Sequence, residues 1–232
     1  MISKTIIMPC YNEVNTILEI IERVKKNIND NDNIIIVDDG STDGTRDLLS
    51  KINNSNIIIK FHENNFGKGK AIQTALSEEL KEIIIIQDAD LEYNPKDYKF
   101  LLKPFIETNA EVVYGSRFIG NNEYTRIHLF WHYLANKILT FVCNIFTNLN
   151  MTDMETGYKC FKREVIKSIK LKEKSFGIEP EITIKLAKKK FVFYEVPVSY
   201  AGRSYEDGKK IGLKDAIRAI YSIFKYSLFK NT

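Results

Sequence analysis

The sequence predicts an α/β protein with a mostly parallel central sheet flanked by helices. The first observation is a series of Ile- and Val-rich runs that do not alternate with polar residues, at 4–8, 33–37, 56–60, 82–87 and 111–114. Such runs are typical of strands that are buried on both faces of a parallel sheet. The second observation is that helical patterns separate these runs, the order from which right-handed crossovers build a doubly wound sheet.

The predicted helices follow from apolar residues that recur three or four positions apart. In the first half of the chain these patterns cover 14–28, 48–52 and 71–80. The second half is less regular, and we expect helices over 127–149, 180–188 and 213–229 with a strand over 191–196. No internal repeat and no linker rich in Pro, Gly or Ser is visible, so we expect a single domain over 1–232.

The composition excludes several classes of protein. With 44% hydrophobic and 28% charged residues in 232, the chain has the balance of a soluble globular enzyme. A net charge of +4 is too small to indicate nucleic-acid binding. Three cysteines without CxxC spacing indicate free thiols in a reducing cytoplasm rather than a disulfide scaffold or a zinc site. We expect no targeting segment and no membrane-spanning helix, because no run of about 20 uncharged apolar residues occurs.

Polar residues gather at the ends of the first two predicted strands, where ligands of such sheets bind. The first strand ends in residues 9–13 (PCYNE), where Tyr11 and Glu13 could stack on and hydrogen-bond a base, although a plain strand-to-helix turn explains them as well. The second strand ends in Asp38 and Asp39. Two adjacent carboxylates are costly to bring together unless a ligand or cation uses them. Helix capping explains the residues that follow but not this pair.

Residues 67–70 (GKGK) open a predicted helix and could approach an anion closely. The segment is not a P-loop, because the glycine five positions earlier and the following Ser or Thr are missing. It also lacks the third glycine of a dinucleotide-binding loop. Kinase, GTPase and nicotinamide-dependent functions therefore lose their main support.

The fourth strand is followed by Asp88, Asp90 and Glu92. In an extended segment these side chains project to the same side. Three oxygen donors suit Mg²⁺ or Mn²⁺ that is bound partly through substrate phosphates. The alternative is a solvated acidic loop, but residues 83–86 would deliver the carboxylates into the binding crevice of the sheet.

These motifs, in this order, resemble the family-2 glycosyltransferases and, within them, the dolichyl-phosphate mannose synthase-like group. The matching segments are 9–13, 37–45, 65–69, 88–90, 115–117, 152–159 and 202–211. The resemblance implies a GT-A fold and an inverting, metal-dependent transfer of a sugar from a nucleotide-sugar. The group's plainer Asp-Pro-Thr-Ser-Gly segment is replaced here by one that contains Asp153 and Glu155, which leaves the sugar open.

The resemblance, together with the residues themselves, gives a set of candidate site residues. The candidate donor-binding residues are Pro9, Tyr11, Glu13, Asp38, Asp39, Gly67, Lys68, Asp88, Arg203 and Lys209. The candidate metal ligands are Asp88, Asp90 and Glu92. The candidate catalytic residues are Asp90, Arg117, Asp153 and Glu155.

The nature of the acceptor decides what these residues must do. A lipid phosphate is already anionic, so it needs no general base and benefits from a cation such as Arg117. A sugar hydroxyl needs a carboxylate to take its proton, and Asp153 and Glu155 are the candidates.

The final predicted helix has two distinct stripes. Its basic residues are Lys210, Lys214, Arg218 and Lys225, and its apolar stripe consists of Leu213, Ile217, Ile220, Phe224 and Leu228. A cationic stripe beside an apolar one suits a helix that lies on an anionic membrane surface. A helix that packs on the sheet with its lysines in water explains the pattern equally well.

Our leading hypothesis is transfer of a hexose from GDP-mannose or UDP-glucose to a polyprenyl phosphate, peripherally at the cytoplasmic face of the membrane. Residues 1–117 would bind the nucleotide-sugar, 118–212 the acceptor, and 213–232 would form an amphipathic helix. The alternatives are transfer to a saccharide hydroxyl, a non-catalytic nucleotide-sugar-binding subunit and a phospho-acceptor signalling domain. The intact Asp88 and Asp90 argue against the non-catalytic subunit, and Pro9-Cys10 at the first strand's end argues against the signalling domain.

Overall fold

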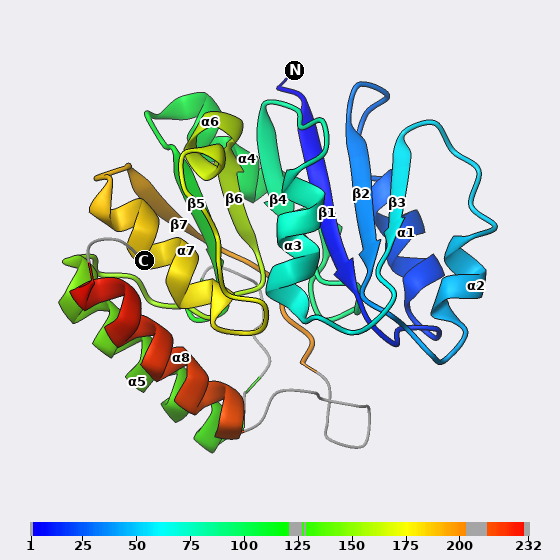
Figure 1. Ribbon diagram of the computed structural model, residues 1–232. Coiled ribbons are helices and arrows are strands. Elements are labelled where there is room, and N and C mark those ends of the chain that lie inside the picture. The colour runs from blue at the N-terminus through cyan, green and yellow to red at the C-terminus, as the bar shows by residue number, and fades with distance from the viewer. Residues whose placement is uncertain (1, 121–126, 128, 203–212, 230–232) are drawn as a thin grey trace.

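The computed structural model describes residues 2–120, 127, 129–202 and 213–229. Within them a seven-stranded sheet has the order β3-β2-β1-β4-β6-β5-β7 (Figure 1). Its strands are β1 (Lys4–Cys10), β2 (Asn33–Asp38), β3 (Ile57–Phe61), β4 (Ile83–Ile86), β5 (Val112–Ser116), β6 (Lys159–Lys162) and β7 (Phe193–Pro197). All neighbours are parallel except β6, which is antiparallel to both β4 and β5.

The five apolar runs of the first half each form a strand, as predicted. Consecutive residues of one strand enter different cores: in β1, Ile7 belongs to one cluster, while Ile6 and Met8 belong to the other. Because both faces of the sheet are covered, both sets of side chains must be apolar, and the runs show no alternation. The strand β6 was not predicted, because its sequence KCFK begins and ends with lysine.

Helices cover both faces of the sheet. One face carries α1 (Ile17–Lys25), α2 (Thr45–Leu49) and α4 (Tyr98–Glu107), which follows a short 3₁₀ helix, η1 (Pro95–Asp97). The other face carries α3 (Lys68–Leu76), α5 (Phe130–Thr147), α6 (Arg163–Lys167), α7 (Ile178–Lys188) and α8 (Leu213–Leu228). The helices α4 and α6 were missed, whereas α5, α7 and α8 lie within a few residues of the predicted ranges.

The helices α5 and α8 lie side by side and pack on α7, at the border of the core on this face of the sheet (Figure 1). Ala219, Ser222, Ile223 and Tyr226 of α8 are buried there. Among the residues that the structure describes, no helix is long and apolar enough to span a membrane. The pair therefore forms a layer that is buried on its inner side and exposed on its outer side.

Candidate active site

A cavity of about 670 Å³ opens at the carboxyl ends of the parallel strands. Many of the residues that line it were singled out in the sequence analysis. These are Pro9, Tyr11, Glu13, Asp39, Gly67, Lys68, Asp88, Asp90, Glu92, Arg117 and Glu155. Asp38 and Asp153 do not line it. Arg203 and Lys209, together with Lys210 of the predicted basic stripe, lie outside the described residues.

The turn that carries Tyr11 and Glu13 is fixed to the loop after β2. The amide of Asn12, whose φ is +52°, donates to Ser41 Oγ at 2.9 Å. The amide of Glu13 donates to Thr45 Oγ1 at 2.9 Å. The polar residues after the first two strands are therefore used partly to bind each other, and this places Tyr11 on the cavity wall.

The two adjacent carboxylates after β2 serve different partners. Asp38 is fully buried, and its Oδ2 pairs with Arg46 Nε at 3.0 Å, so the cation that it uses is the protein's own. Asp39 accepts hydrogen bonds from the amides of Phe66 and Gly67, at 3.1 and 2.6 Å, and contacts His62 Nδ1 at 2.6 Å. Asp38 is thus placed outside the donor pocket for which it was a candidate, and Asp39 holds the loop that leads into α3.

Gly67 and Gly69 allow a close approach between α3 and the segment 173–175. A Cβ at either glycine would collide with the backbone of Glu173 or Lys174, and Gly67 has a φ of +100°. The amide of Lys70 donates to Lys174 O at 3.0 Å. The glycines expected to approach an anion therefore accommodate protein backbone, a role that nothing in the sequence indicated.

The same segment is tied to the C-terminal helix. Glu173 Oε1 accepts hydrogen bonds from Lys225 Nζ and Tyr226 Oη, each at 2.8 Å. Arg218 Nε lies 3.8 Å from Glu173 Oε2. Two members of the predicted basic stripe of α8 thus face this carboxylate.

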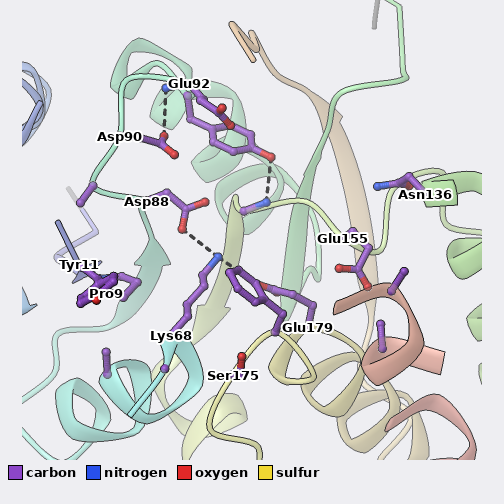
Figure 2. A pocket seen from close by; sticks show the side chains of 18 of the residues that line it. Pro9, Tyr11, Lys68, Asp88, Asp90, Glu92, Asn136, Glu155, Ser175 and Glu179 are labelled. Carbon is purple, nitrogen blue, oxygen red and sulfur yellow. Dashed lines mark hydrogen bonds and ion pairs between the residues drawn. The ribbon is translucent and has the colours of Figure 1, made fainter. Parts of the chain in front are cut away.

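A chain of ion pairs starts at the cavity wall, where Figure 2 shows Lys68, Asp88 and Glu179 close together. Lys68 Nζ lies 2.8 Å from Asp88 Oδ1 and 3.0 Å from Glu179 Oε1. Glu179 Oε2 in turn lies 2.6 Å from Nζ of the fully buried Lys159. Burial alone lowers the pKa of Lys68, but Asp88 and Glu179 outweigh it, so this pKa lies above its ordinary value. Glu179 and Lys159 were missed because charged residues on a helix and a short strand are ordinarily expected at the surface.

Asp88, Asp90 and Glu92 all line the cavity, but Glu92 is bound to other protein groups. The segment bends after β4 instead of staying extended, and the amide of Glu92 donates to Asp90 Oδ1 at 3.0 Å. Tyr200 Oη donates to Glu92 Oε2 at 2.7 Å. Over the described residues, no group of three or more His, Cys, Asp or Glu side chains is placed to hold a metal ion. The predicted three-carboxylate cluster is therefore not formed.

The remaining pair fits a magnesium-type ion. Mg²⁺ is commonly held by one or two carboxylates together with substrate phosphates and water. Gly157 makes room for this arrangement, because a Cβ there would overlap the carboxylate of Asp88. Asp88 and Asp90 could supply the protein's share of such a site, and a bound diphosphate would supply the rest.

Arg117 and Asp153 form a bidentate ion pair. Arg117 Nε donates to Asp153 Oδ2 and Nη2 donates to Oδ1, both at 2.7 Å. Burial raises the pKa of Asp153, but the neighbouring Arg117 lowers it by more. The pKa of Asp153 is therefore below its ordinary value. A fully buried, ion-paired carboxylate is a poor general base. Asp153 therefore positions Arg117, which lines the cavity and lies over the Tyr200 ring at 5.1 Å.

Glu155 differs from Asp153 in its surroundings. It lines the cavity, and its buried Oε1 has no hydrogen-bond partner among the described residues. Burial and the nearby Glu179 raise the pKa of Glu155 to about 7. Of the two candidates for a general base, Glu155 alone combines access to the cavity with a suitable pKa.

The cavity continues between α5 and α8 as an arm that the sequence did not predict. Figure 2 shows Pro9 and Tyr11 on one side of Lys68 and Asp88, and Asn136 and Glu155 on the other. The arm is lined by Trp131, His132, Ala135, Asn136, Leu139, Phe176, Ala216 and Ala219. The members on α5 were missed because its pattern resembles an ordinary apolar helix face.

Comparisons with known proteins agree with this architecture. The sequence model of glycosyl transferase family 2 matches residues 5–170. The glycosyltransferase AglJ of Haloferax volcanii is 29% identical over 216 residues, which cover 92% of this chain and 67% of that protein. The UDP-N-acetylglucosamine–dolichyl-phosphate N-acetylglucosaminyltransferase of Methanococcus voltae is 27% identical over 244 residues. The alignment covers 97% of this chain and 96% of that protein.

A solved structure shows the same fold. Glucosyl-3-phosphoglycerate synthase from Mycobacterium tuberculosis, crystallised with Mn²⁺, uridine diphosphate and phosphoglyceric acid, has a TM-score of 0.74. It is 15% identical, and the alignment covers 100% of this chain and 80% of that one. The match confirms the GT-A fold that the resemblance implied.

Proposed function

Because the chain belongs to glycosyl transferase family 2, we propose that it transfers a hexose from a nucleotide-sugar to a polyprenyl phosphate at the cytoplasmic face of a membrane. One observation carries this proposal. A single cavity joins the Lys68–Asp88 end to an arm between two helices whose outer faces expose apolar side chains. A charged donor and a lipid acceptor would meet in such a cavity.

At the donor end, the nucleoside would lie against Pro9 and Tyr11. Asp88 and Asp90 would hold Mg²⁺ or Mn²⁺, which would stabilise the negative charge that develops on the departing diphosphate. Lys68 adds a positive charge to the same region. In this proposal residues 1–117 supply most of the donor site.

At the acceptor end, Arg117 would orient the attacking phosphate. Its Nε and Nη2 are committed to Asp153, which leaves Nη1 to face the acceptor. The phosphate oxygen attacks the anomeric carbon while the bond to the diphosphate breaks, so a single displacement inverts the configuration. No general base is needed, because the attacking oxygen is already anionic. The donor nucleoside diphosphate leaves with the electron pair.

The arm and the outer surface of α5 and α8 suit the lipid part of the acceptor. On α5 the exposed apolar side chains are Phe130, Trp131, Tyr133, Ile138, Phe141, Ile145 and Phe146. On α8 they are Ile217, Ile220, Tyr221, Phe224 and Leu228. Contiguous apolar surface of this kind marks interaction sites, and aromatic residues suit the membrane interface. We call this surface the α5/α8 face, and propose that it rests on the bilayer.

One relative supports a lipid acceptor. The Methanococcus voltae protein is named for transfer to dolichyl phosphate, and the alignment spans nearly the full length of both chains. Its donor carries N-acetylglucosamine, so UDP-N-acetylglucosamine joins the mannose and glucose donors that we propose to test.

The test is incubation of the protein with membrane lipid and radiolabelled GDP-mannose, UDP-glucose or UDP-N-acetylglucosamine, in turn, followed by extraction and mild acid. We expect one donor to give a lipid-linked sugar that mild acid releases, because glycosyl phosphates are acid-labile. Omission of lipid and addition of chelator are the controls. Label that appears only in acid-stable saccharide would contradict the lipid-phosphate acceptor.

A second candidate function is transfer to a saccharide hydroxyl. Glu155 favours it, because a carboxyl with a pKa of about 7 on the cavity wall is suited to take a proton from a hydroxyl. The pH dependence of the reaction separates the two candidates, since only the hydroxyl needs Glu155 in its ionised form.

A further inference from the structure

We propose that, in the protein without substrate, the Lys68 ammonium group occupies the position in which the divalent cation binds. When the cation binds Asp88, the ammonium group leaves that carboxylate and pairs with the donor diphosphate. This inference rests on the proposed function and concerns how its metal site is filled. It predicts that cation and nucleotide bind as a pair, and that the cation alone binds weakly.

The geometry places the ammonium group in direct competition with a metal ion. Lys68 Nζ lies 2.8 Å from Asp88 Oδ1, and its side chain is 15% exposed, so the contact is largely shielded from water. A cation that coordinates Asp88 Oδ1 must displace this ammonium or share the oxygen with it. Because like charges at such distances repel strongly in a shielded site, sharing is unfavourable.

The charge balance of the cluster explains why a nucleotide would help. Lys68 and Lys159 supply two positive charges, and Asp88 and Glu179 supply two negative charges, all within one chain of ion pairs. With Asp90 the set carries one net negative charge, and a divalent cation at Asp88 and Asp90 changes it to one net positive charge, which Lys68 then faces. A diphosphate that arrives with the cation supplies the anion that Lys68 has lost.

Lys68 is also free to make this move without losing its anchor. It begins α3, and its second partner is Glu179 on α7, at 3.0 Å. Its four-carbon side chain can therefore release Asp88, keep Glu179 within reach and point into the cavity, where Lys68 is part of the wall. Glu179 would keep the ammonium group near the site in both states.

The test measures Mn²⁺ binding by electron paramagnetic resonance, without turnover, in wild-type protein and in Lys68→Met. In the absence of nucleotide we expect Lys68→Met to bind Mn²⁺ about tenfold more tightly, a typical coupling between two ligands of one site. We also expect UDP or GDP to tighten Mn²⁺ binding less in this variant than in the wild type. Lys70→Met is the matched control, because it removes the same charge two residues away and Lys70 does not line the cavity; its Mn²⁺ affinity should not change.

Equal or weaker Mn²⁺ binding by folded Lys68→Met, relative to the wild type, would overturn the proposal. If circular dichroism shows that the variant is unfolded, the ¹⁵N resonance of the Lys68 ammonium in wild-type protein decides instead. It should shift when Mg²⁺ is added together with nucleotide, and an unchanged resonance would also refute the proposal. Wild-type protein that binds no Mn²⁺ even with UDP or GDP would instead remove the metal site of the proposed function itself.

Discussion

The two ends of the cavity are held in different ways. At the donor end, polar side chains from the strand ends bond to one another, as in the contacts of Asp39 with the amides of Phe66 and Gly67. In the arm, most of the wall comes from α5 and α8, and these helices expose apolar side chains on their outer surface. A rigid polar site suits a charged donor whose diphosphate must be placed accurately, whereas an apolar arm suits a flexible chain. Three substitutions test this contrast.

The largest effect should come from Asp90→Ala at the donor end. Loss of this carboxylate removes half of the protein's proposed contribution to the metal site, so we expect turnover to fall roughly a thousandfold. Initial-rate measurements with saturating donor would check this, and the circular dichroism spectrum should remain that of the wild type. Asp47→Ala, on the exposed side of α2, is the control. Substantial activity of Asp90→Ala in the presence of chelator would show that the donor end works without a metal.

A smaller effect should come from Phe141→Asp on the α5/α8 face. Phe141 is 65% exposed, and burial of such a side chain in a bilayer contributes about 2 kcal/mol, so we expect roughly thirtyfold weaker binding to anionic liposomes. Sedimentation with liposomes measures this, while hydrolysis of the donor should not change.

Ile106→Asp is the matched control for the membrane prediction. Ile106 is 68% exposed, but it lies on α4, at the opposite face of the sheet. Its substitution should leave liposome binding unchanged. Equal losses in both variants would mean that the α5/α8 face is not the surface that meets the membrane.

The smallest effect should come from Glu155→Gln in the middle of the cavity. In the wild type, the acceptor KM should rise several-fold between about pH 6 and about pH 8, because Glu155 becomes anionic beside the lipid phosphate. The variant should lose this dependence. A wild-type rate that instead increases over this range, and is flat in Glu155→Gln, would favour a hydroxyl acceptor.

Stability gives an independent check on Glu155. Its folded-state pKa is raised above the ordinary value, so its contribution to stability is present at low pH and is lost as the pH rises through about 7. Thermal denaturation should therefore show Glu155→Gln gaining stability relative to the wild type at pH values above 7. No relative gain would mean that Glu155 is not perturbed in the folded protein.

The sheet could be predicted from the sequence because its central strands are buried on both faces. This burial leaves continuous apolar runs, such as residues 83–86, that no surface element would show. The strand β6 escaped because Lys159 is buried through its ion pair with Glu179. This pairing depends on α7, which lies further along the chain, so the local sequence around Lys159 does not indicate it.

The candidate site could be predicted where residues of a suitable type directly follow a strand, as Asp88 and Asp90 follow β4. It was not predictable where the direction of a side chain decides its role. Asp38 and Asp39 are neighbours, yet one turns to Arg46 and the other to the loop before α3. Asn136 was missed because its place on the cavity wall follows from how α5 packs, which the helical pattern leaves open.

The contacts of Glu173 bear on how peripheral attachment can be studied. This residue is held by Lys225 and Tyr226, and its own carbonyl and that of Lys174 lie against Gly69 and Gly67. Deletion of α8 would therefore also release the backbone that supports the first turn of α3. A shortened chain would lose part of the proposed membrane-binding surface and the support of the proposed nucleotide site together, so single surface substitutions separate the two effects more cleanly.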